Sequence, residues 1–286
     1  MRYLVIGASG QLGRDLCPRL PGEVIGVGRE QADLTRPDLL KATLDEHQPQ
    51  TVVNCAAYNF VDRAETEPET AFAVNALGAR SLATLCGERQ ITLVHFSTDY
   101  VFGLDAGRTI PWNEDDPPGP VSVYAASKLA GEYFVRMYCP RHFVIRTCGL
   151  YGIWGSGGKG GNFVETMLKL AGQGKPLRIV GDQVCTPTYT RDLAEVLTPL
   201  IGTTHYGLYH LTSAGSCSWF EFAGAIFDLA GLKVERSPVT SVEYGAAARR
   251  PAYSVLSNRR YESLGFAPMR PWREALATYL AERLRK

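Results

Sequence analysis

The chain has 286 residues, of which 45% are hydrophobic and 21% are charged, and its formal net charge is +1. This length and composition are typical of a globular protein with a large core, and they exclude a disordered chain, a collagen-like fibre and a coiled coil. Because the charges nearly balance, there is no electrostatic reason to expect nucleic acid or an anionic membrane as a partner.

Seven cysteines are scattered along the chain without a C-x-x-C pair. An odd number of scattered cysteines suits a reducing compartment and argues against a disulfide framework or a zinc site. The apolar run after Met1 meets glycine at Gly7, which is too short for a signal peptide or a membrane span. We therefore expect a cytoplasmic protein.

The N-terminal stretch predicts a dinucleotide site. Residues 4–6 form a short β-prone run, and the segment Gly-Ala-Ser-Gly-Gln-Leu-Gly follows it before a helix-compatible stretch. Glycines between a strand and a helix allow a tight turn and a close approach to a pyrophosphate at the helix N-terminus. The spacing differs from the commonest fingerprint, G-x-G-x-x-G. The residues expected to contact the cofactor here are Gly7, Gly10, Gln11, Leu12 and Gly13.

The end of the second predicted strand, residues 24–27, bears on the choice of cofactor. The acidic residue that would bind the ribose 2′-hydroxyl of NAD is missing, and Gly28-Arg29 stands in its place. The Arg29 guanidinium can accept a 2′-phosphate, which favours NADPH and leaves NADH as an option. A solvated loop arginine is the alternative. Asp33 and Leu34 follow as an edge of the expected adenine pocket.

Two further buried runs, residues 51–57 and 93–96, read as strands whose carboxyl ends face the ligand. The first ends in small residues, Ala56 and Ala57, which let a cofactor lie close. The second delivers Ser97, Thr98 and Asp99 at its end. We expect His95, inside this strand, to be packed core.

A helix is expected between these strands, from Thr66 as N-cap to about residue 89. Asn75 and Gly78 interrupt its apolar side. A polar residue on such a side is either paired to backbone or directed at a ligand, and the sequence leaves both readings of Asn75 open.

Tyr124 and Lys128 form the pair around which the remaining chemistry is arranged. On a helix, the i, i+4 spacing brings the phenol and the ammonium to one face. A phenol beside a fixed cation ionises more easily, so Tyr124 is suited to donate or take a proton near neutral pH. The alternative is an ordinary surface pair. The loop before this helix contains an acidic cluster, residues 114–116, which we interpret as a solvated face.

The amino-acid composition changes after Arg146. Residues 149–161 are rich in glycine, include Lys159, and are a candidate lid over a ligand. Ser218-Trp219-Phe220-Glu221 is a capping box that predicts a helix start. The last predicted helix follows Pro271 and carries Leu276, Leu280 and Leu284 on one face.

Strands that alternate with helices at this rhythm predict an α/β fold with a doubly wound parallel sheet (Rossmann-like) and a smaller interleaved C-terminal substrate lobe. We expect residues 1–148 to form the dinucleotide-binding domain, with parts of 185–220 and 250–260 returning to it. Residues 149–286 would form mainly the substrate-binding lobe.

Taken together, the motifs resemble the extended short-chain dehydrogenase/reductases, and within them the dTDP-4-dehydrorhamnose reductase family. The resemblance covers nearly the whole chain, and its most specific part is Ser-Thr-Asp-Tyr-Val-Phe at the right distance from Tyr-x-x-x-Lys. The stretches that carry it are 7–13, 54–58, 61–65, 97–102, the Tyr124 and Lys128 pair, 146–147, 162–163, 182–183, 187–188, 192–194 and 250–254.

The resemblance implies hydride transfer from a reduced nicotinamide to the C4 ketone of a nucleotide-linked deoxysugar, with dTDP-4-dehydro-L-rhamnose as the first candidate substrate. Tyr124 would protonate the new alkoxide, Lys128 would lower the pKa of Tyr124 and hold the nicotinamide ribose, and Thr98 would bind the reacting oxygen. The other residues expected at the cofactor are Ala56, Ala57, Tyr58, Asn75 and Ser97. Those expected at the substrate, besides Thr98 and Tyr124, are Asp99, Tyr100, Trp154 and Arg250.

Two positions separate this chain from its relatives. Sugar-nucleotide dehydratases have an Asp-Glu pair after the threonine, and Tyr100 removes that second carboxylate, which favours plain reduction over elimination. The family's usual tryptophan in Arg-x-Ser-Trp-Val-Tyr-Gly is replaced by Gly149, so an aromatic contact with the sugar is missing and the particular sugar is in doubt. Trp154 is a candidate to compensate.

Three alternatives stay open from sequence. A non-catalytic NADP-binding regulatory subunit resembles this family too, although a binder has no need of Tyr124, Lys128 and Thr98 together. An epimerase or a dehydratase on the same fold is disfavoured by Tyr100.

Some family members are described with magnesium at a subunit contact, where Asp15 would be the acidic residue. The metal requirement is unknown and a homodimer is an option.

Overall fold

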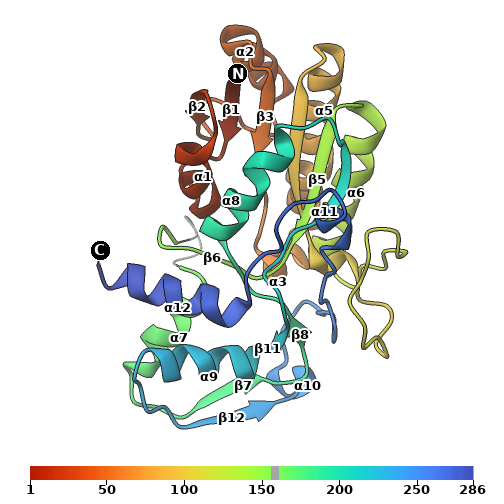
Figure 1. Cartoon of the computed structure of the whole chain (residues 1–286). Helices are drawn as coiled ribbons and strands as arrows, with labels where there is room; N and C mark the ends of the chain where they lie inside the picture. Colours follow the sequence, from red (N-terminus) through yellow and green to blue (C-terminus); the bar gives the residue numbers. More distant parts are fainter. Residues whose placement is uncertain (156–160, 286) are drawn as a thin grey trace.

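The computed structural model describes residues 1–155 and 161–285. Its larger part is a six-stranded parallel sheet in the order β10-β5-β4-β3-β1-β2 (Figure 1). The predicted doubly wound sheet is therefore confirmed. The strands are β1 (Arg2–Ile6), β2 (Glu23–Val27), β3 (Thr51–Asn54), β4 (Thr92–Thr98), β5 (His142–Thr147) and β10 (Gly207–His210).

Two apolar cores lie on the two faces of the sheet. The first includes leucines of α1 (Gln11–Leu16) and α8 (Thr190–Ile201), together with Tyr261 of the short helix α11 (Arg259–Glu262). The second core includes side chains from α2 (Pro37–His47), α5 (Ala79–Glu88) and α6 (Val123–Tyr138). Because helices cover both faces, the strands are apolar almost throughout, as in other parallel sheets.

The chain reverses direction across the sheet after β2. It first moves outward from β1 to β2 and then returns to β3 on the other side of β1. In open α/β sheets, ligands bind beyond the carboxyl ends of the strands at such a reversal. The glycine turn after β1 and the small residues after β3 meet at this point.

The predicted long helix between β3 and β4 consists of three segments. After a separate short helix, α3 (Val61–Ala64), it runs through α4 (Pro68–Phe72), the π-helical segment η2 (Ala73–Gly78) and α5. The prediction of Thr66 as N-cap is wrong, because its hydroxyl donates to the Arg63 carbonyl at 3.1 Å and Glu67 precedes the first turn. The spacing of residues in the sequence does not show that α3 ends just before Thr66, nor that the Arg63 carbonyl accepts from the Thr66 hydroxyl.

A smaller lobe contains most of the C-terminal half (Figure 1). Among the residues described, three two-stranded sheets and four helices build it around a third apolar core. The strand pairs are β6 (Leu150–Tyr151) with β9 (Thr188–Tyr189), β7 (Leu177–Val180) with β12 (Arg236–Val239), and β8 (Val184–Cys185) with β11 (Cys217–Ser218). The helices are α7 (Phe163–Ala171), α9 (Trp219–Leu229), α10 (Ser241–Tyr244) and α12 (Trp272–Arg283).

Several local predictions for this lobe can be compared with the structure. The capping box of α9 is confirmed, since Ser218 and Glu221 each bind the other's backbone. Leu276 and Leu280 of α12 are buried, but Leu284 lies beyond the helix and is 83% exposed. In the candidate lid, residues 150–151 pair with β9, while Lys159 lies outside the described residues.

The acidic cluster before α6 is only partly solvated, which corrects the prediction. Glu114 is buried and accepts a hydrogen bond from the backbone N–H of His210 at 3.0 Å. Burial raises the pKa of this carboxyl. Asp115 and Asp116 pair with Arg260 and Arg108. The loop folds back onto the edge strand β10, and this long-range contact is invisible in local charge patterning.

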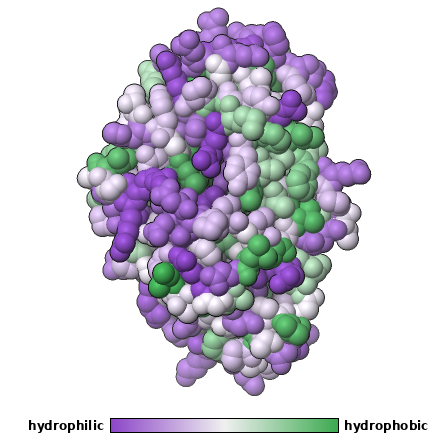
Figure 2. Space-filling model, turned by 90° about the vertical axis from the view of Figure 1, so that its right-hand side faces the viewer, coloured by the Kyte–Doolittle hydropathy of each residue, from purple (hydrophilic) through white to green (hydrophobic). Residues whose placement is uncertain are grey.

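The side of the molecule on the right of Figure 1 carries a hydrophobic area next to hydrophilic side chains (Figure 2). Helices α4 and α6 and the segment η2, which contact one another, expose apolar side chains: Phe72, Leu77, Tyr133 and Met137. Within residues 1–155 and 161–285, no helix combines the length and the hydropathy needed to cross a membrane.

Candidate active site

The glycine turn after β1 lies directly against the end of β3. Gly7 has φ +77°, and a Cβ on it would lie 3.1 Å from the backbone nitrogen of Ala56. A Cβ on Gly13 would lie 2.5 Å from the Gly7 carbonyl oxygen. Both glycines are required by close backbone approach, and the result is a tight glycine turn at the sheet's reversal point, which fits a pyrophosphate.

The other residues of the turn have different surroundings. Gly10 is the N-cap of α1, and Leu12 is buried in the first core, so only the backbone of Leu12 is suited to a cofactor contact. Gln11 donates through Nε2 to the Leu150 carbonyl at 3.0 Å. Its buried Oε1 has no hydrogen-bond partner among the described residues, which leaves one acceptor for a ligand.

Arg29 lies beyond the end of β2 with 82% of its side chain exposed. Its Nε donates to Asp33 at 2.8 Å, and Thr35 also donates to this carboxylate. Partial burial raises the pKa of Asp33, but the bonds from Arg29 and Thr35 outweigh it and lower the pKa to about 2. Leu34 is core, packed against Gly78. Asp33 thus orients Arg29 at the place where a 2′-phosphate is expected.

Asn75 lies in the π-helical segment and is paired to backbone, the first of the two readings left open. Its Oδ1 accepts from the Tyr58 N–H at 2.9 Å, while Nδ2 donates to the Tyr58 carbonyl at 2.9 Å and to Ser127 Oγ at 3.0 Å. Asn75 therefore fixes the chain after Ala57 against the helix of Tyr124. Its effect on a cofactor would be indirect.

Tyr124 and Thr98 meet at the carboxyl end of β4. Ser122 caps α6 and places Tyr124 in its first turn, where the side chain is only 9% exposed. Burial raises the pKa of Tyr124, and a hydrogen bond with the Thr98 hydroxyl acts in the opposite direction. The expectation of easier ionisation is not met in this structure, because burial outweighs the other influences. A phenol with a raised pKa stays protonated at neutral pH and is a proton donor.

Lys128 is buried one turn further along α6, and its Nζ donates to the Phe96 carbonyl at 2.5 Å. Burial lowers the pKa of Lys128 to about 8, although the nearby Glu132 carboxylate acts to raise it. The surface-pair alternative is excluded by this burial. His95, on the same strand as Phe96, is buried and contacts Asn54, as predicted for a core residue.

Asp99 is buried behind Thr98. Its Oδ2 accepts from Ser254 Oγ at 2.5 Å, and its Oδ1 accepts from Thr98 at 3.2 Å. Burial raises the pKa of Asp99 to about 6, against the effect of these hydrogen bonds and one from Cys148. Asp99 therefore fixes the Thr98 hydroxyl by accepting its hydrogen bond.

A cavity of about 580 Å³ is lined by Tyr100, the neighbour of Asp99, and otherwise by side chains from residues 163–250. Tyr100 lines it and also meets the Tyr124 ring edge-on at 6.1 Å. Arg250 lines it as well, held by a two-bond pair with Asp62 at 2.7 and 3.0 Å. The remaining charged side chains of the lining are Arg178 and Arg249. Three arginines suit an anionic substrate.

Trp219 was missed as a site residue, although its capping box was recognised. It lines the cavity and lies 4.7 Å from Phe163, ring centre to ring centre. Gly149 has φ +52°, and a Cβ on it would lie 3.1 Å from the tip of the Trp219 indole. Trp219 therefore fills the space beside Gly149. Trp154 is placed elsewhere, at 3.2 Å from Asp15, with Arg14 over its ring.

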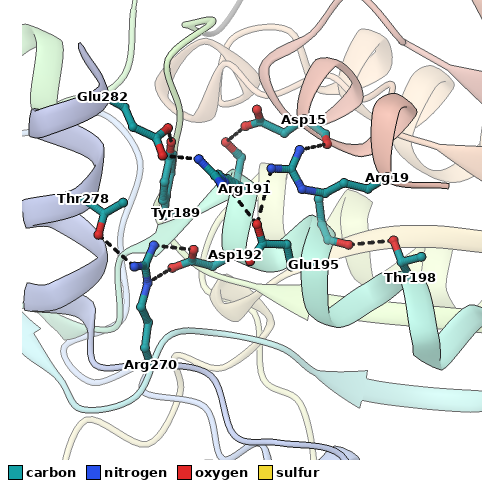
Figure 3. A network of polar contacts seen from close by, with 12 residues as sticks. Asp15, Arg19, Tyr189, Arg191, Asp192, Glu195, Thr198, Arg270, Thr278 and Glu282 are labelled. Atoms are coloured by element: carbon teal, nitrogen blue, oxygen red, sulfur yellow. Dashed lines mark hydrogen bonds and ion pairs between the residues drawn. The ribbon is translucent and has the colours of Figure 1, made fainter. Parts of the chain in front are cut away.

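The surroundings of Asp15 do not fit a magnesium ion. Its two carboxylate oxygens accept from Thr190 at 2.5 Å and Trp154 at 3.2 Å, and magnesium needs free oxygen ligands in octahedral geometry. Figure 3 shows arginines between the neighbouring carboxylates: Arg19 pairs with Glu195, Arg191 with Glu195 and Glu282, and Arg270 with Asp192. In the described part of the chain, no group of three or more metal-ligating side chains occurs.

A tight glycine turn at the reversal of a parallel sheet, together with a buried phenol and lysine, defines an NAD(P)H-dependent oxidoreductase. The sequence family described as RmlD substrate binding domain matches residues 1–285. The chain belongs to the dTDP-4-dehydrorhamnose reductase family, which acts in nucleotide-sugar and polysaccharide biosynthesis.

Individual relatives are similar in sequence to this chain over nearly its full length. The chain is 43% identical to the spore coat polysaccharide biosynthesis protein SpsK of Bacillus subtilis (strain 168), over 99% of this chain and 98% of SpsK. It is 41% identical to dTDP-4-dehydrorhamnose reductase of Streptomyces griseus, over 96% and 91% of the two chains. A crystal structure of dTDP-4-dehydrorhamnose reductase from Bacillus anthracis str. Ames in complex with NADP has a TM-score of 0.92 at 39% identity and covers 98% of this chain and 99% of that one. The protein is a reductase of a dTDP-4-keto sugar.

Proposed function

We propose that the protein reduces the C4 ketone of dTDP-4-dehydro-L-rhamnose to give dTDP-L-rhamnose, with NADPH as the preferred reductant. The contact between Tyr124 and Thr98 supports this most directly, together with Tyr100, which meets the Tyr124 ring and lines the arginine-lined cavity. Such a cavity beside a protonated phenol suits a diphosphate-linked keto sugar. The seven free cysteines support a cytoplasmic location, where thiols stay reduced.

The residues divide the chemistry between them. The glycine turn and Gln11 would hold the dinucleotide, which supplies a hydride to the keto carbon when bound. Thr98 would orient the carbonyl oxygen, and Tyr124 would give its O–H proton to that oxygen as the alkoxide forms. Lys128 would keep a positive charge next to the resulting phenolate. Arg250 and its two neighbouring arginines would bind the diphosphate.

Turnover tests the reaction and the sugar together. We expect NADPH oxidation, followed at the nicotinamide absorbance band, with dTDP-4-dehydro-6-deoxy-L-mannose generated in situ, and dTDP-L-rhamnose identified by chromatography. A non-catalytic subunit would bind NADPH and sugar nucleotide without turnover, and an epimerase would need no added NADPH. Turnover only with another 4-keto sugar would keep the reductase and overturn the sugar, as a changed surface at Gly149 and Trp219 allows.

The cofactor preference depends on Arg29. We expect Arg29→Ala to weaken NADPH binding roughly tenfold and NADH binding hardly at all, because only NADPH carries the 2′-phosphate. Fluorescence titration of both cofactors measures this. Arg36→Ala, which removes another exposed arginine paired to an aspartate, is the control. An equal effect of Arg29→Ala on both cofactors would contradict the role of this guanidinium.

A further inference from the structure

Glu132 is a fully buried carboxylate beneath the active site, and no step described so far uses it. It lies on α6, one helical turn after Lys128, and its side chain is 1% exposed. Arg146 of β5 donates to its two oxygens at 2.9 and 2.7 Å, and Ser97 of β4 donates to Oε1 at 2.5 Å. One carboxylate thus joins the catalytic helix to two neighbouring strands at their carboxyl ends.

The arginine of this pair is itself fixed. Arg146 is 2% exposed, its guanidinium lies 5.0 Å from the centre of the Phe102 ring, and its Nη1 is 3.4 Å from His210 Nε2. A buried ion pair offers little net stability, because desolvation offsets most of the attraction. We therefore explain the Glu132–Arg146 ion pair by the groups that it holds in position rather than by the stability that it adds.

Ser97 directly precedes Thr98. Its hydroxyl is tied to Glu132, so the last residues of β4 are anchored to the helix of Tyr124 and Lys128. A shift of this strand end would displace the Thr98 hydroxyl from Tyr124. The Phe96 carbonyl that accepts from Lys128 belongs to the same strand. The positions of Thr98 and Lys128 therefore both depend on how β4 is aligned with α6.

Few charges surround Lys128. On its own helix it has Tyr124, which is neutral, and Glu132. On β4 it faces His95, whose pKa burial and Lys128 lower well below its usual range, so this ring stays neutral. Asp99 follows β4 behind Thr98, and Arg146 on β5 is neutralised by Glu132. Burial lowers the pKa of Lys128 to about 8, and Glu132 is the charge that opposes this effect.

We propose that Glu132 is a positioning residue of the active site, whose carboxylate supplies the negative charge that keeps Lys128 cationic and anchors Ser97 so that Thr98 faces Tyr124. This inference rests on the proposed roles of Tyr124, Lys128 and Thr98. It assigns Glu132 no direct contact with substrate or cofactor. Its two effects are separable, because one depends on charge and the other on a hydrogen-bond acceptor.

The test compares Glu132→Gln, which removes the charge and keeps an acceptor for Ser97, with Glu132→Asp, which keeps the charge. We measure kcat and the NADPH dissociation constant from pH 6 to 10. In the wild type both deteriorate as Lys128 loses its proton above pH 8 or so. This fall in kcat and in NADPH affinity forms the alkaline limb of the pH profile. Without the neighbouring negative charge the ammonium is less stable, so in Glu132→Gln the alkaline limb moves to lower pH by roughly one unit. In Glu132→Asp it stays near the wild-type position.

Glu132→Gln leaves Arg146 unpaired, so the single variant is liable to unfold. The double variant Glu132→Gln with Arg146→Gln removes both buried charges, and we expect it to fold and to show an alkaline shift in the same direction but smaller, because no uncompensated arginine is left near Lys128. Glu46→Gln, an exposed change on α2, is the control. A lower melting temperature with an unmoved limb would overturn the proposal and leave a structural role. If wild type turned over no 4-keto sugar, the proposed function would fail, and the NADPH-binding limb would still test Glu132.

Discussion

Replacing Tyr124 by phenylalanine is expected to lower kcat roughly a thousandfold, within the range that a positioned general acid contributes. The variant loses only the phenolic O–H, which is the proton source for the alkoxide. The ring would stay in its buried cluster with Tyr58 and two alanines. The dissociation constant for NADPH should therefore change little, and so should the melting temperature. Single-turnover NADPH oxidation and fluorescence titration separate the two effects.

Tyr133→Phe is the matched control for this prediction. Tyr133 lies on the same helix, is 49% exposed, and does not line the cavity. We expect wild-type kcat from it. Wild-type turnover by Tyr124→Phe would rule out the proton-donor role, whereas a matching loss of NADPH affinity would show that the hydroxyl acts in binding.

Replacing Gly131 by alanine is expected to destabilise the protein by about 3 kcal/mol, at the upper end of the usual cost of overpacking. Gly131 lies inside α6, against the π-helical segment η2, and a Cβ there would come within 2.2 Å of the Asn75 carbonyl oxygen. Helix propensity alone predicts the opposite sign, because alanine is better than glycine inside a helix by about 1 kcal/mol. Urea unfolding decides between the two.

Gly202→Ala provides the comparison. Gly202 follows α8 with φ −78°, and a Cβ on it would meet no atom closer than 3.4 Å, the Pro199 carbonyl oxygen. We expect a change of about 0.5 kcal/mol or less there. A stable Gly131→Ala protein would mean that η2 can move away from α6 without cost. Because Asn75 also fixes Tyr58, we expect Gly131→Ala to weaken NADPH binding in the fraction that remains folded.

The sequence predicted those features that depend on local pattern. The glycine turn after β1, the end of β4 at Thr98, and the Tyr124 and Lys128 pair each rest on a short run with a defined spacing, whereas the predicted strand 51–57 ends already at Asn54. The parallel sheet follows from apolar runs separated by helices, because both faces of such a sheet are covered.

The missed features depend on contacts between distant segments. Burial decides that Tyr124 holds its proton more tightly, and helical spacing says nothing about depth in the fold. Glu114 is buried because its loop reaches a strand almost a hundred residues later. Trp219 reaches Gly149 across the smaller lobe, so the sequence showed a lost aromatic contact without showing which side chain fills the space. The π-helical turn at Asn75 has no simple composition signal.

The chain returns to the large sheet after residue 148, so a fragment that ends there lacks part of the large sheet and of its core. The edge strand β10 covers β5, and α8 contributes Leu193, Leu197 and Leu200 to the first core. A recombinant fragment that stops at residue 148 would lack both, so the hydrogen-bonding edge of β5 and the apolar face beneath α8 would be open to water. We expect such a fragment to aggregate on expression, so that cofactor affinity has to be measured on the whole chain.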